Sequence, residues 1–74
     1  MNAILLQIRK LHESPKKYLL ADSALKAKEY LKKGKQEELK SLIKKLNGFY
    51  DSMTPQERSI CIELVNKIME DVKE

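Results

Sequence analysis

All four of the prolines and glycines in this 74-residue chain stand where a helix is expected to begin or end. Pro15 and Pro55 each follow a hydroxyl residue, and proline suits the first position of a helix because the N–H there has no intrahelical partner. Gly34 and Gly48 each follow an apolar pattern with a pair of lysines near its end, and glycine readily takes the left-handed conformation that ends many helices. This punctuation divides the chain into four helical segments.

Within each segment, apolar residues recur at the spacing of a helix. Ile4, Ile8 and Leu11 are separated by four and three residues, and no segment alternates with the two-residue period of a half-buried strand. Residues 54–57, TPQE, have the form of a capping box. We therefore predict one all-α domain over residues 1–74: a small bundle of four short helices, at about 2–13, 15–33, 36–47 and 55–72, with no β-sheet.

Chains this short usually rely on disulfides, metals, tight helix packing or association. Cys61 is the only cysteine, so no internal disulfide can form. His12 is the only histidine, and no ligand spacing suggests zinc. The composition, 42% hydrophobic and 35% charged, is typical of a folded helical domain with a polar surface rather than a disordered chain. We therefore expect no metal and no cofactor, and a fold held by helix packing or by association.

The apolar runs of the chain are short. None approaches the roughly 18 residues needed to cross a bilayer, and Arg9 and Lys10 follow the N-terminal apolar run instead of preceding it, unlike in a signal peptide. A lone thiol is typical of a reducing compartment. We expect a cytoplasmic protein with no membrane partner.

Charge is distributed unevenly along the chain, although the net charge is only +4. Residues 14–47 hold ten lysines against four acidic residues, whereas residues 48–74 hold three basic residues against six acidic ones. The chain thus combines a basic body with an acidic last helix. This asymmetry favours an acidic protein surface or a nucleic acid as partner.

The 15–33 helix carries apolar residues on two sides. Its predicted core face holds Leu20, Ala24, Ala27 and Leu31. Tyr18 and Leu25, seven residues apart, fall on roughly the opposite side, close to Lys28 and Lys32. Another helix could cover this pair within the monomer, or the two residues could be scattered surface apolars. Our hypothesis is that Tyr18, Leu25, Lys28 and Lys32 bind a protein partner with an acidic surface, because exposed aromatic and apolar residues with a charged rim are typical of interface anchors.

The 55–72 helix has apolar residues over about 200° of its circumference, against about 100° for an ordinary surface helix. It is therefore either the central helix of the bundle or an element shared by two copies. The spacing of residues 61, 64 and 68 fits a heptad seam, but over too few turns for a coiled coil. Ile62, Val65 and Met69 are the candidate self-association residues, and the sequence leaves both a monomer and a homodimer open.

Residues suited to catalysis are scarce. No glycine-rich phosphate loop occurs, and Cys61 is predicted to face an apolar arc where a thiolate is disfavoured. His12, at the rim of an apolar face, is interpreted as a packed or partly exposed side chain. Glu37 and Glu38 are adjacent, so on a helix they point about 100° apart and make a poor catalytic dyad. We predict that the protein is not an enzyme.

These observations favour a small protein-interaction module, such as an adaptor, regulator or inhibitor, that docks on a larger macromolecule through an apolar, lysine-rimmed helical surface. The alternative is a basic nucleic-acid-binding protein, in which the second and third helices form a helix-turn-helix. Arg9 is the only arginine among the first 57 residues, whereas base readout relies heavily on arginine. Nonspecific phosphate contact is therefore favoured over sequence reading in this alternative.

Overall fold

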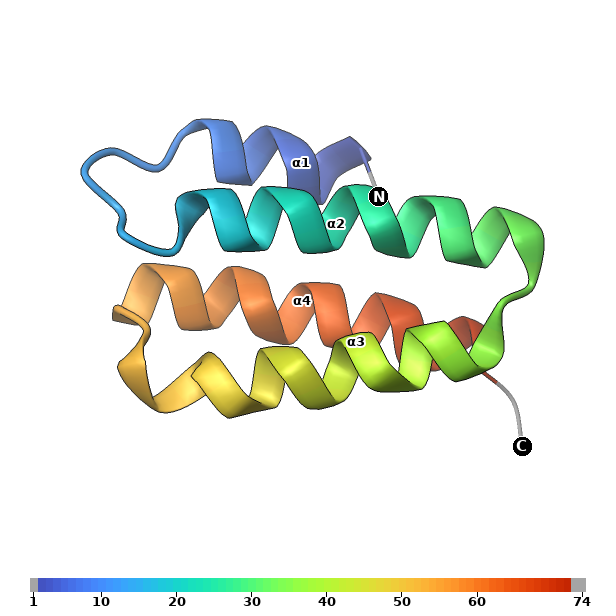
Figure 1. Ribbon diagram of the computed structural model, residues 1–74. Coiled ribbons are helices and arrows are strands. Elements are labelled where there is room, and N and C mark those ends of the chain that lie inside the picture. The colour runs from blue at the N-terminus through green and yellow to red at the C-terminus, as the bar shows by residue number, and fades with distance from the viewer. Residues whose placement is uncertain (1, 73–74) are drawn as a thin grey trace.

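The computed structural model describes residues 2–72, which form four α-helices and no β-strand. The elements are α1 (Asn2–Arg9), α2 (Lys17–Lys33), α3 (Gln36–Phe49), the 3₁₀ turn η1 (Tyr50–Ser52) and α4 (Pro55–Asp71). Consecutive helices run antiparallel, and α1 is so short that it covers only about half of α2 (Figure 1). The prediction of a small all-α bundle is confirmed.

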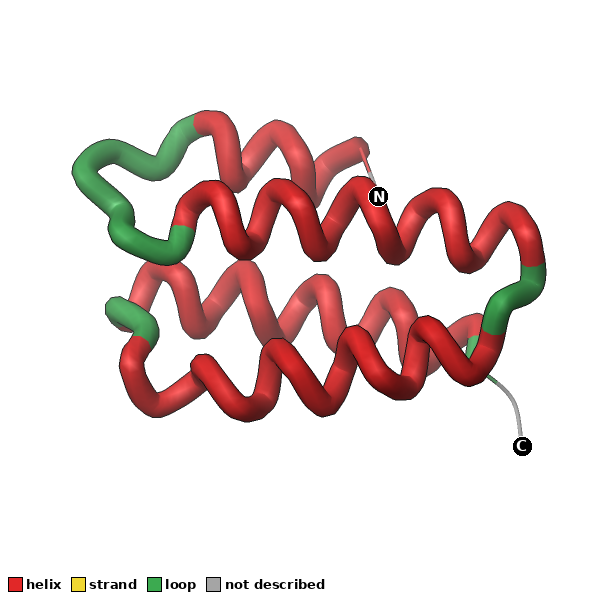
Figure 2. The backbone as a smooth tube through the Cα atoms, viewed as in Figure 1, coloured by secondary structure: helices red, strands yellow, loops and turns green. Residues whose placement is uncertain are grey.

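The connection between α1 and α2 is longer than the sequence predicted (Figure 2). Helix α1 ends at Arg9 and not near residue 13, because the N–H groups of Lys10 and Leu11 donate to carbonyls three residues back and tighten the last turn. Glu13 then takes a left-handed conformation, with φ of 52°. Helix α2 begins at Lys17, two residues after the predicted proline start. Residues 10–16 therefore form a loop, and the side chain of Leu11 in this loop is buried in the core.

The two glycines behave differently. Gly34 ends α2 in the left-handed conformation, with φ of 69°, and the N–H of Lys35 donates to the carbonyl of Tyr30 at 2.9 Å. Gly48 was expected to end the third helix in the same way, but α3 continues through it to Phe49 and runs on into η1. Gly48 does not take a positive φ, so its flexibility is not used to stop the helix.

The core is formed by apolar residues from all four helices and two loops. It consists of Ile4, Ile8, Leu11, Leu20, Ala24, Ala27, Leu39, Leu42, Leu46, Met53, Ile60, Cys61, Leu64 and Ile68. Helices α2 and α4 each pack against the other three helices, so the central position expected for the last helix is shared with α2. Residues 61, 64 and 68 are all buried within the chain's own core, so that heptad spacing is used inside the monomer.

The predicted capping box at the start of α4 is present. The Thr54 side chain accepts a hydrogen bond from the Glu57 N–H at 3.2 Å, and the Glu57 carboxylate accepts one from the Thr54 N–H at 2.8 Å. The sequence did not reveal that the same carboxylate also binds the 10–16 loop. It accepts hydrogen bonds from the Ser14 hydroxyl and from the Lys16 N–H, the latter at 3.0 Å. Ser14 is therefore not the N-cap of α2 but one of the groups that fix this loop to α4.

The Glu57 carboxylate is fully buried, with 0% of the residue exposed. Burial by itself would raise the pKa of Glu57, but hydrogen bonds from Ser14, Thr54 and Lys16 outweigh that effect and lower it overall. The buried group is thus a charged carboxylate that joins two helix openings.

Candidate functional site

The outward side of α2 carries the predicted binding residues, which we call the α2 outer face: Tyr18, Leu25, Lys28 and Lys32. Tyr18 is 84% exposed and Leu25 is 56% exposed, and both lysines are exposed. No other helix of the described chain folds over this pair, so the alternative in which they are buried within the monomer does not apply. The two apolar side chains stand two helical turns apart, about 10 Å along the axis.

Helix α2 turns this face outward because its opposite side is occupied by the core. Leu20, Ala24 and Ala27 are completely buried there, and the two alanines lie at the helix surface that packs on the bundle. The Tyr18 side chain on the opposite side stays in water, so its hydroxyl needs no partner within the bundle. The 3.6-residue period places Tyr18 and Leu25 opposite the core face, and the packing of the other helices leaves them uncovered.

The acidic residues near the α2 outer face are paired along the helix with lysines one turn away. Lys26 binds Asp22 at 3.0 Å and Lys33 binds Glu29 at 2.7 Å. Hydrogen bonding to its partner raises the pKa of Lys26 and of Lys33 and lowers that of Glu29. Lys28 and Lys32 belong to neither pair.

Leu25 lies at a shallow hollow whose rim is mainly basic. The residues that line it are Leu25, Lys28, Glu29, Lys32 and Lys33. Three of the four charged side chains around this apolar floor are lysines, and the single glutamate is the one already bound to Lys33. The hollow therefore offers an apolar contact surrounded by net positive charge.

The candidate self-association residues lie on the outer side of α4. Ile62 is 46% exposed, Met69 is 59% exposed and Val65 is partly exposed. Met69 and Val72 line a hollow together with Ile43 and Lys40 of the neighbouring helix α3. We call the set Ile43, Ile62, Val65, Met69 and Val72 the α3–α4 stripe.

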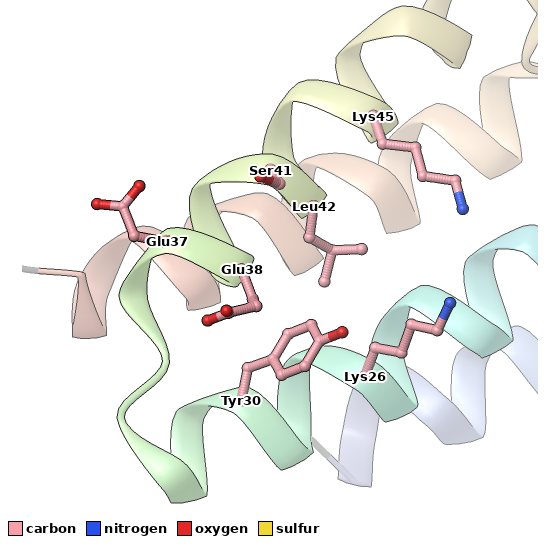
Figure 3. Close-up of a pocket in the computed structure, with 7 residues that line it drawn as sticks. All are labelled: Lys26, Tyr30, Glu37, Glu38, Ser41, Leu42 and Lys45. Atoms are coloured by element: carbon pink, nitrogen blue, oxygen red, sulfur yellow. The ribbon is translucent and has the colours of Figure 1, made fainter.

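A groove that sequence reasoning missed runs between α2 and α3 (Figure 3). Its walls are Lys26, Tyr30, Glu37, Glu38, Ser41, Leu42 and Lys45. Leu42 and the Tyr30 ring lie near its middle, the two lysines lie toward one end, and Glu37 and Glu38 extend in different directions at the other. The groove is open and of mixed charge, and it holds no dyad of carboxylates. Only the pairing of two helices brings these residues together, so no local sequence pattern could have indicated it.

The residues considered for chemistry lie in different surroundings. Cys61 is buried in the core, and burial raises the pKa of its thiol, which disfavours the thiolate nucleophile. His12 is exposed on the 10–16 loop. Among the residues whose positions the structure describes, no group of three or more histidine, cysteine, aspartate or glutamate residues could hold a metal ion.

Helices α2 and α3 form an antiparallel hairpin (Figures 1 and 2). A helix-turn-helix reader instead sets its two helices at a steep angle so that the second can enter the major groove. The apolar side of α3, with Leu39, Leu42 and Leu46, is buried in the bundle. The antiparallel hairpin differs from that arrangement, and the nucleic-acid alternative stays a prediction.

No helix within residues 2–72 combines the length and apolar character that crossing a membrane requires. Comparison with protein-family models, with curated proteins and with solved structures found no match to this chain.

Proposed function

We propose that this protein is a non-enzymatic interaction module that docks on an acidic protein surface through the α2 outer face. The observation that carries the proposal is the exposure of Tyr18 and Leu25 on one side of a helix whose other side is fully packed. A module of this kind acts as an adaptor, regulator or inhibitor of the larger protein that it binds. The proposal includes a cytoplasmic location, which the lone thiol supports.

Tyr18 and Leu25 are suited to anchor a complex. Tyrosine presents a large apolar ring and a hydroxyl at a low cost in side-chain entropy, which is why it is enriched among residues that dominate binding energy. The two anchors are fixed on a regular helix, so a partner with pockets about 10 Å apart meets them without reordering this chain.

Lys28 and Lys32 define the charge of the partner. Asp22 and Glu29 are already bound to Lys26 and Lys33, so the remaining charge next to Leu25 is positive. Opposite charge across an interface accelerates encounter and excludes wrong partners more than it adds affinity. An acidic rim around an apolar pocket is therefore the complementary surface.

The test is quantitative capture from a nuclease-treated lysate of the source organism, comparing the wild type with the double variant Tyr18→Ala/Leu25→Ala. Loss of two anchors should reduce capture of the specific partner at least about 30-fold. The matched control is Phe49→Ala/Leu6→Ala, which also removes one exposed aromatic residue and one exposed leucine, from other parts of the surface. Capture that responds equally to both variants would contradict the proposal.

Charge reversal provides the second arm. Lys28→Glu/Lys32→Glu should slow association with the captured partner and reduce its salt dependence, whereas Lys10→Glu/Lys45→Glu should have a smaller effect. A fluorescent DNA duplex tests the other class of partner. Tight, steeply salt-dependent binding of the duplex, together with capture that nuclease abolishes, would favour nucleic acid and overturn the protein-partner proposal.

A further inference from the structure

We infer that the α3–α4 stripe is the contact surface for a second copy of this chain, with the two α4 helices side by side and parallel. This inference does not depend on the α2 outer face, because no residue of α2 belongs to the stripe. It rests on the exposure of Ile62 and Met69, which the partly buried Ile43, Val65 and Val72 flank, and on the charges along the two edges of the stripe.

The stripe is a continuous apolar band across two helices. Ile62 and Met69 stand two turns apart on α4 and are about half exposed. Val72 lies next to Met69, and both share a hollow with Ile43 of α3. The band therefore includes side chains from α3 as well as the line of side chains along α4.

Lysine borders the stripe on the side of α3. Lys40 lines the same hollow as Ile43, Met69 and Val72, so it stands at the level of Met69 along the bundle. Lys44 is exposed one turn further along α3, which runs antiparallel to α4 and therefore brings Lys44 closer to the level of Val65.

Glutamate borders the stripe on the other side. Val72, the C-cap residue just after α4, follows Met69 by three residues and lies toward α3, about 60° around the helix axis in one sense. Glu70 follows Met69 by one residue and is therefore turned about 100° in the opposite sense, away from α3. Glu63 has the same relation to Ile62. Both glutamates are exposed, and neither they nor Lys40 takes part in the two ion pairs among the described side chains.

These two edges select one symmetry. A two-fold axis parallel to α4 places the lysine edge of one copy against the glutamate edge of the other, with Lys40 opposite Glu70 at the same level. A two-fold axis perpendicular to α4, which would make the helices antiparallel, places lysine against lysine and glutamate against glutamate. Because like charges across an interface are costly, the parallel pairing is favoured.

The dimer is expected to be transient. Five apolar residues and four edge charges per copy form a surface smaller than that of a standard stable interface. Sedimentation velocity over protein concentrations from about 10 μM to about 1 mM should show the mass rise from monomer to dimer. Met69→Glu should abolish the rise, whereas Leu6→Glu, at an exposed leucine of α1, should leave it unchanged. A monomer mass throughout would overturn the inference.

The parallel arrangement has its own test. Lys40→Glu and Glu70→Lys should each weaken dimerisation at least about tenfold, because each reversal acts twice in a symmetric dimer, and the combined variant should recover most of the loss. Under mild oxidation, Met69→Cys should form a disulfide-linked dimer, since parallel helices bring identical positions together, while the wild type with only buried Cys61 should not. Cross-linking that requires a mixture of Met69→Cys and Ile62→Cys chains would show antiparallel helices and overturn the parallel arrangement.

Discussion

Helices α2 and α4 open with similar sequences, SPKK and TPQE, yet they are capped in different ways. Thr54 and Glu57 cap α4 locally and reciprocally. The α2 opening has a lysine where α4 has Glu57, and no side chain of its own caps it. Its Ser14 hydroxyl and Lys16 N–H instead donate to Glu57 of the other helix. A hydroxyl residue followed by proline is therefore not sufficient for a local cap. A carboxylate three residues after the hydroxyl residue is also needed, so that the helix start is capped by its own side chains.

Glu57→Ala should break both openings at once and have the largest effect. It removes the acceptor for Thr54 and leaves the partly buried Ser14 and Lys16 donors without their partner, so we expect a loss of about 3 kcal/mol in the free energy of unfolding. Urea unfolding followed by far-UV circular dichroism measures it. A loss no greater than that of a single cap, about 1 kcal/mol, would show that the link to the 10–16 loop adds nothing.

Acid should weaken the same link without any substitution. The pKa of Glu57 is lower in the folded chain than its ordinary value of 4.5, so the unfolded chain binds more protons between the two values. The stabilisation is therefore complete above the ordinary value and is lost as the pH falls through the folded value. Unfolding measured from neutral pH down to about pH 2 should show this loss, and Glu57→Gln should flatten the dependence. An equal slope in both proteins would assign the acid effect to other groups.

Ser14→Ala removes the hydrogen bond to Glu57 from the α2 side alone. Loss of a hydrogen bond to a buried carboxylate should cost about 1.5 kcal/mol. In a double-mutant cycle with Glu57→Ala, most of that cost should disappear, because the two groups act through one hydrogen bond. Ser59→Ala, at an exposed position of α4, is the matched control and should change stability by no more than about 0.5 kcal/mol.

The periodicity of the apolar residues and the local capping signals predicted most of the fold. They could not predict the contacts between helices. The outward position of Tyr18 and Leu25 follows from counting 100° per residue along one helix, and the structure leaves both exposed. Whether α1 would cover them could not be predicted, because its length is set by the turn after Arg9. The second role of Glu57 and the α2–α3 groove around Tyr30 also join residues that are distant in sequence.

The two proposed binding surfaces also differ in how far the sequence predicts them. The residues proposed for the α2 outer face lie on one helix and could all be named from its wheel. The α3–α4 stripe could be named only in part: Ile62, Val65 and Met69 belong to one helix, but Ile43 joins them, and Lys40 borders them, through the packing of α3 on α4. The charge on the lysine edge, which selects the parallel dimer, therefore becomes visible only once the helices are paired.

Substitutions of the two glycines, which differ in whether they end a helix, are expected to have the smallest effects on stability. Gly34 has a left-handed backbone, so Gly34→Ala should cost about 1 kcal/mol although nothing lies within 4 Å of an added Cβ. Gly48 lies within α3, also with open space around it, so Gly48→Ala should raise the free energy of unfolding by about 0.5 kcal/mol, mainly because alanine restricts the unfolded chain. Opposite signs in urea unfolding confirm that only Gly34 serves as a stop signal. If Gly48→Ala is destabilising, α3 does not continue through residue 48 in solution, and both glycines end helices.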